Sequence, residues 1–123
     1  MTQHYSQFDL KMAWDYKTAD GTTVIDGLVK NTRFQAMYDL EIRAAVLDTT
    51  GKVAARSVTF VVPRQLDLEE TAGFTLKLPV AVQPGTRLRF TYRYRGTEGG
   101  GFGGGLEAGS NWMQSFEAAV PAK

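Results

Sequence analysis

Apolar and polar residues alternate with period two along most of the chain, which is the pattern of a β-strand with one buried face. In residues 7–17 the predicted buried face holds Phe8, Leu10, Met12, Trp14 and Tyr16, and the opposite face holds Asp9, Lys11, Asp15 and Lys17. The clearest alternation lies in residues 86–96, where leucine and aromatic residues alternate with arginines and one threonine.

Seven strands follow from this alternation: residues 7–17, 22–32, 36–48, 52–62, 74–80, 86–96 and 111–120. Turn residues separate them at 19–21, 48–51 and 83–85, and no segment has the period of an amphipathic helix. Short strands at regular spacing favour an all-β fold, here an immunoglobulin- or fibronectin-like antiparallel β-sandwich in one domain over residues 1–123.

Three local details stay open at this level. Gly27 indicates either a β-bulge or a close approach of neighbouring backbone. Residues 64–73 form either a short helical turn or an irregular crossing between sheets. In residues 36–48 the alternation predicts that Tyr38, Leu40 and Ile42 point inward and that Asp39, Glu41 and Arg43 point outward.

Composition excludes several classes of function. The 123-residue chain has a net charge of +1 and no cysteine, so disulfides and thiolate metal sites are ruled out, and no strong field favours nucleic acid or an anionic membrane. No apolar run is long enough to span a membrane, and the start of the chain lacks the pattern of a signal peptide. The compartment stays unknown: a cytoplasmic protein starting at Met1 and an excised extracytoplasmic domain both fit.

Parts of the chain resemble the FxLYD-type domains, which are small bacterial and archaeal immunoglobulin-like sandwiches. Residues 24–31 resemble the second strand of that family, ending in Asn31, and residues 36–40 resemble the strand that names it. Residues 47–53 resemble the turn that follows. The resemblance covers about residues 22–92 and departs at position 35, where Gln35 replaces the expected Phe. It implies a non-catalytic accessory domain and supplies no catalytic residues.

Glycine is concentrated in residues 96–111, between the last two predicted strands. No Lys-Ser or Lys-Thr pair and no helix follows, so a phosphate-binding loop is disfavoured. A mobile hairpin tip and a binding loop both fit, because long loops without secondary structure are usually either functional or disordered. In the second case Phe102, flanked by glycines, and Trp112, at the edge of the loop, would contact a partner.

Arginines line one side of the strand at residues 86–96: Arg87, Arg89, Arg93 and Arg95. Such a face could hold an anionic polymer or a phosphorylated surface. The structural alternative is cross-strand pairing with Asp39, Glu41 and Glu117. Nucleic acid is disfavoured because the net charge is nearly neutral.

Other chemistry is weakly represented. The aromatic residues that could form a sugar-stacking platform are Trp14, Tyr16, Tyr92, Tyr94 and Trp112, but the first four share faces with core residues. Asp67, Glu69 and Glu70 could surround Ca²⁺, although they lack EF-hand spacing. His4 is the only histidine, and no pair of carboxylates indicates a glycosidase.

The sequence therefore predicts a non-enzymatic structural or interaction domain without cofactor or metal. Its partner would be another protein or further copies of itself, contacted through residues 96–111 and the outward arginines. The alternative is a ligand-binding module for carbohydrate or an anionic polymer.

Overall fold

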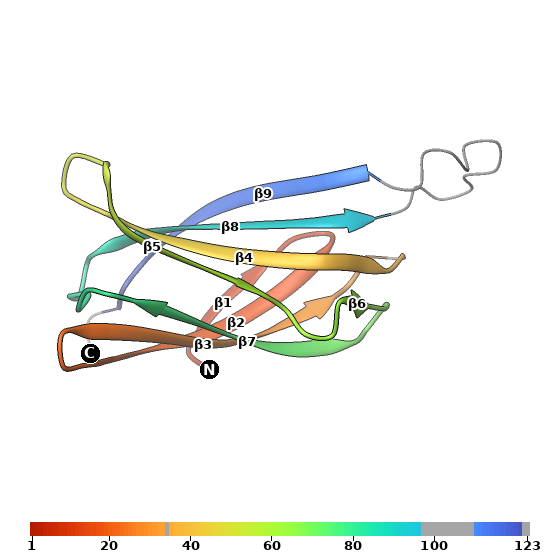
Figure 1. Ribbon diagram of the computed structural model, residues 1–123, viewed down its shortest axis with the longest axis horizontal. Helices are drawn as coiled ribbons and strands as arrows, with labels where there is room; N and C mark the ends of the chain where they lie inside the picture. Colours follow the sequence, from red (N-terminus) through yellow and green to blue (C-terminus); the bar gives the residue numbers. More distant parts are fainter. Residues whose placement is uncertain (34, 97–109, 122–123) are drawn as a thin grey trace.

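The computed structural model describes residues 1–33, 35–96 and 110–121, and within these every strand pairing is antiparallel. Two sheets face each other (Figure 1). Sheet A has the order β1 (Gln3–Ser6), β2 (Leu10–Ala19), β3 (Thr22–Asn31) and β7 (Thr71–Leu78). Sheet B has the order β5 (Val53–Phe60), β4 (Met37–Leu47), β8 (Arg87–Gly96) and β9 (Ser110–Ala119), and β6 (Gln65–Leu66) pairs with one end of β4.

The predicted β-sandwich is confirmed, and each of the seven predicted strands has a counterpart. The structure adds β1 and β6, two short strands that alternation over so few residues could not reveal. The open segment 64–73 contains β6, a turn and the start of β7, so it is an irregular crossing rather than a helix. Because β5 pairs with β4 and not with β7, sheet B is the larger sheet, unlike the constant-type immunoglobulin arrangement.

The core lies between the sheets and is made by the predicted apolar faces. Burying each large side chain there stabilises the fold by about 1.5–3 kcal/mol. The largest fully buried side chains are Trp14, Tyr92, Tyr94, Phe90, Leu10, Ile25, Met37, Leu40, Ile42, Leu66, Leu76 and Leu78. Tyr16 is only partly buried.

The tight turn between β2 and β3 is confirmed in detail. Asp20 and Gly21 both have positive φ, 53° and 78°, as a two-residue type I′ hairpin requires. Residue pairing then runs without a shift from Ala19–Thr22 to Leu10–Asn31, so Gly27 lies in regular strand and not in a bulge. The predicted close approach is the correct alternative, because a Cβ at Gly27 would collide with the Phe74 ring and lie 2.7 Å from the Ala13 carbonyl oxygen.

The predicted orientations of three residues are wrong: Phe8, Asp9 and Tyr38. Strand β2 begins at Leu10, so Phe8 lies in the preceding bend with 64 % of its surface exposed, and Asp9 is buried instead. In β4, Asp39 has a positive φ of 55° and the pairing with β8 shifts between Tyr38 and Glu41. This irregularity turns Met37 into the core in place of Tyr38.

Candidate functional site

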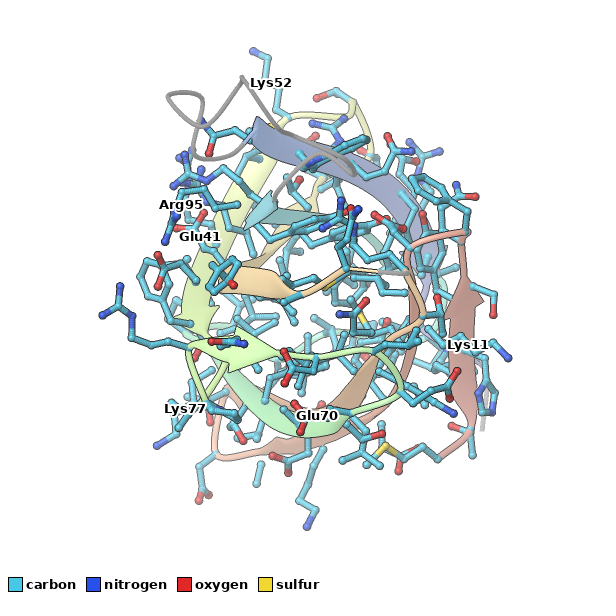
Figure 2. The ribbon with its side chains drawn as sticks, turned by 90° about the vertical axis from the view of Figure 1, so that its right-hand side faces the viewer. Lys11, Glu41, Lys52, Glu70, Lys77 and Arg95 are labelled. Atoms are coloured by element: carbon cyan, nitrogen blue, oxygen red, sulfur yellow. The ribbon has the colours of Figure 1, made fainter. Side chains whose placement is uncertain are left out.

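The outer surface of sheet B is rich in arginine. Its guanidinium groups come from β4 (Arg43), β5 (Arg56) and β8 (Arg87, Arg89, Arg93 and Arg95), and this surface is called the arginine face below. The strand order β5-β4-β8 brings these arginines together, since β4 pairs with both β5 and β8. Figure 2 shows Arg95 and Glu41 on one side of the sandwich and Lys11 on the other.

Among the described residues, the three carboxylates that pair with these arginines each lie between two guanidinium groups. Glu41 Oε1 is 3.2 Å from Arg43 and 3.3 Å from Arg93. The side chain of Glu41 is only 7 % exposed because these guanidinium groups cover it, which corrects its predicted outward exposure. The alternation places Glu41 on the outer face as expected, but it is shielded there.

The other carboxylates follow the same arrangement. Glu117 on β9 is 3.7 Å from Arg87 and 3.5 Å from Arg89, and Asp39 is 2.7 Å from Arg64 and 3.0 Å from Arg95. The structural alternative of cross-strand pairing is therefore realised for the four predicted arginines. Solvent screens exposed pairs of this kind, so they orient the side chains more than they stabilise the fold.

The positive charge of the face is not fully neutralised. Each acid is shared by two arginines, and Arg56 forms no ion pair with any described residue. The chain as a whole has a net charge of only +1, so the topology has concentrated positive charge on one sheet. This excess would attract an acidic surface at short range, because salt screens charges beyond about 8–10 Å.

Asp39 gives a pH-dependent prediction. Hydrogen bonds from Arg64 and Arg95 lower its pKa from the ordinary 3.8 to about 2. A carboxyl group whose pKa is lower in the folded state than in the unfolded state stabilises the fold at pH values above its unfolded-state pKa. This contribution is lost as the pH falls through about 2, the pKa of Asp39 in the folded state. We expect the Asp39 carboxyl resonance to titrate near pH 2 by NMR and to titrate at higher pH in Arg64→Gln. Equal titration in both proteins would contradict the pairing.

A hollow of about 330 Å³ opens in the arginine face between β5, β4 and β8. Arg43, Arg56 and Arg89 line it, together with Val58 and Thr91. Ala45 lies between Arg56 and Arg89 in the residue pairing, so a methyl group stands where a longer side chain would fill the space.

The end of the sandwich from which residues 97–109 depart is packed with aromatic rings. Tyr94 and Trp112 are stacked with ring centroids 6.3 Å apart, and the Arg33 guanidinium lies 5.4 Å from each centroid. Phe8 meets Trp112 edge-on at 6.3 Å. Trp112 is therefore half-buried against its own domain, while Phe102 lies outside the described residues.

Beside these rings lies a buried polar cluster that sequence reasoning missed. Asp9 is 2 % exposed and accepts hydrogen bonds from the hydroxyls of Tyr92 at 3.0 Å and Tyr94 at 2.8 Å. Burial, reinforced by hydrogen bonding, raises the pKa of both tyrosines, so they remain protonated donors. No local signal could have revealed this cluster, because the tyrosines lie more than 80 residues from Asp9 along the chain.

Asn31 forms a second buried cluster. Its side chain donates to the carbonyl oxygens of Gln35 and Leu66 and accepts from the backbone N–H of Arg33. The amide thereby joins the end of β3 to β6, beneath sheet B. The polar residue that ends the segment resembling the FxLYD pattern thus has a structural role in this chain.

The structure gives little support to the other candidate sites, the sugar-stacking platform and the Ca²⁺ site. Trp14, Tyr92 and Tyr94 are buried, so these rings form no exposed platform for sugars. Glu69 pairs with Lys30 at 2.8 Å, and the described residues contain no group of three or more potential metal ligands. No helix in the described part of the chain is long and apolar enough to cross a membrane.

Comparison with known proteins places the fold. No family model matches the chain, and no curated protein matches it. Among solved structures it is similar to the GAE domain of GGA2p from Saccharomyces cerevisiae, with a TM-score of 0.64 and 9 % identity over 98 % of this chain and 97 % of that one. It is also similar to the GAE domain of yeast GGA1, with a TM-score of 0.59 and 7 % identity over 95 % and 96 %.

At these identities the likeness shows the fold alone. The chain is an immunoglobulin-like β-sandwich, and its alignment with the GAE domains spans nearly the whole of both chains.

Proposed function

We propose that this domain is a non-catalytic interaction module that binds another protein through the arginine face. The observation behind the proposal is the composition of that face: a positive charge in excess of its carboxylates, next to apolar side chains that solvent reaches. Val58, Phe60 and Met113 are 52 %, 61 % and 62 % exposed. Exposed apolar residues rimmed by polar groups are typical of surfaces that bind other proteins.

The residue pairing places these apolar residues on the arginine face itself. Phe60 is opposite Glu41, Glu41 is opposite Arg93, and Arg93 is opposite Met113. Directly paired residues of neighbouring strands point to the same side of a sheet. The row therefore runs from an exposed ring through an ion pair to an exposed methionine. Arginine, methionine and aromatic residues are the types enriched in protein interfaces.

Residues 96–111 are the second part of the proposed contact. They join β8 and β9, the two strands at one edge of the arginine face. A partner bound at that edge would therefore lie near both the arginine face and the ends of this segment. Phe102 in this segment and Trp112 directly after it remain the predicted contact residues. The resemblance to FxLYD-type domains agrees with an accessory role and likewise remains a prediction.

Charge reversal tests the proposal. The double change Arg89→Glu and Arg93→Glu is expected to abolish capture of a specific partner from a lysate of the source organism, measured by photo-crosslinking and mass spectrometry. The matched control is Lys17→Glu, an exposed cation on β2 in the other sheet, which should leave capture intact. Far-UV circular dichroism confirms that the variants fold.

Capture that is equally strong with the reversed face would overturn the arginine face as the contact. Phe102→Ala in the same experiment tests the loop: several-fold weaker capture with an unchanged melting temperature is expected. Light scattering at rising concentration identifies the case in which the partner is a second copy of the chain, since the apparent mass would then increase.

A further inference from the structure

We infer that the hollow above Ala45 binds an acidic side chain of an extended peptide segment from the partner protein. This inference rests on the proposed function and narrows it to one site and one class of ligand. The groups that would hold the acidic side chain are Arg43, Arg56 and Arg89. They come from three adjacent strands, so their relative positions are set by the sheet and not by a loop.

The spacing of the sheet suits a carboxylate. Arg56, Ala45 and Arg89 are successive partners across β5, β4 and β8, so the two arginines start about 10 Å apart, twice the strand separation. Arginine side chains that lean over an alanine from both sides can donate to one carboxylate between them. Arg43 stands two residues along β4 from Ala45, about 7 Å away, and closes a third side.

The charge of the hollow is available to a ligand. Arg89 lies 3.5 Å from Glu117, which also pairs with Arg87. Arg43 pairs with Glu41, which also pairs with Arg93. Arg56 has no acidic partner among the described residues. A ligand carboxylate would therefore complete the pattern seen on the rest of the face, in which every acid lies between two guanidinium groups.

The surroundings favour a peptide over a polyanion. Along β5, Arg56 is followed at intervals of two residues by Val58 and Phe60, both exposed. An extended peptide has the same repeat of about 6.6–7 Å per two residues, so an acidic residue in the hollow would place its next alternate side chains over Val58 and Phe60. A sulfated glycan has no apolar side groups at that spacing.

The test uses fluorescein-labelled peptides in which one glutamate is followed at alternate positions by valine and phenylalanine, with serine between, in both sequence directions. We expect saturable binding by fluorescence anisotropy. Arg56→Gln in the protein, or glutamine for the glutamate of the peptide, should weaken it about tenfold, the loss of one charge-assisted hydrogen-bonding partner. Ala45→Met, which fills the hollow without changing charge, should weaken it to a similar extent.

Lys17→Gln is the control, because it removes one positive charge from an exposed position on β2 in the other sheet, and it should change affinity less than twofold. The inference is overturned if no peptide shows saturable binding, or if the Arg56→Gln and Ala45→Met proteins bind the peptides as well as the unchanged protein does. It is also overturned if heparin binds the protein and the peptides do not. If the peptides fail but reversal of Arg89 and Arg93 still abolishes partner capture, only the assignment of the hollow is wrong and the proposed function stands.

Discussion

Replacing Asp9 by alanine is expected to destabilise the domain by about 3 kcal/mol, although this residue precedes the first long strand and looks like a surface position. The change removes the acceptor shared by Tyr92 and Tyr94, which are each only 1 % exposed. Each buried hydroxyl left without a partner costs about 1–3 kcal/mol. For a domain of this size the melting temperature should fall by about 10 °C.

Thermal and urea unfolding followed by circular dichroism measure this effect. Asp26→Ala, an exposed acid on β3, is the control and should cost far less. The triple variant that adds Tyr92→Phe and Tyr94→Phe to Asp9→Ala should recover much of the loss, because it removes the orphaned donors together with their acceptor. If Asp9→Ala is no more harmful than Asp26→Ala, the carboxylate is not the organising acceptor of the cluster.

Gly27→Ala is expected to destabilise the domain by about 2–3 kcal/mol through overpacking. The added methyl would collide with the ring of Phe74, which faces Gly27 on the neighbouring strand β7, and would lie 2.7 Å from the Ala13 carbonyl oxygen. A ring can turn aside, but the carbonyl belongs to the paired backbone of β2 and cannot move without breaking the ladder.

Gly73→Ala is the matched control. It lies on β7 opposite Leu28, and a methyl there would have no neighbour closer than 3.7 Å. We expect it to be neutral or stabilising by up to about 1 kcal/mol, because alanine restricts the unfolded chain. Both variants are measured by denaturant unfolding. Equal stability of the two alanine variants would show that the sheet relaxes around position 27, contrary to the tight packing described here.

The Asp9 cluster bears on the proposed interaction surface. Tyr92 and Tyr94 point inward from β8, and Arg93 and Arg95 point outward from the same strand. Anchoring the tyrosines to Asp9 therefore fixes the strand that carries four of the six arginines of the arginine face. A variant that loosens this anchor should weaken partner binding indirectly, which is why stability has to be measured beside every binding experiment.

The sequence by itself determined the seven long strands, several turns and the outward direction of the four arginines on β8. These features are local: alternation with period two requires only that one face of a strand be buried, and a type I′ turn requires only residues that accept positive φ. The close approach at Gly27 was one of two local alternatives, and the choice between them required the ring of Phe74 from another strand.

Only the tertiary structure decided the rest. Asp9 is buried because it directly precedes β2 and accepts hydrogen bonds from two tyrosines that are distant in the sequence. Tyr38 turns outward because the β4–β8 ladder shifts beside it. Arg56 joins the arginine face, and the hollow above Ala45 exists, because β5 pairs with β4 on the side opposite β8. Strand order and register depend on contacts between segments that are distant in the sequence, because the two sheets pack around one core. The residue pattern within a single strand therefore cannot predict them.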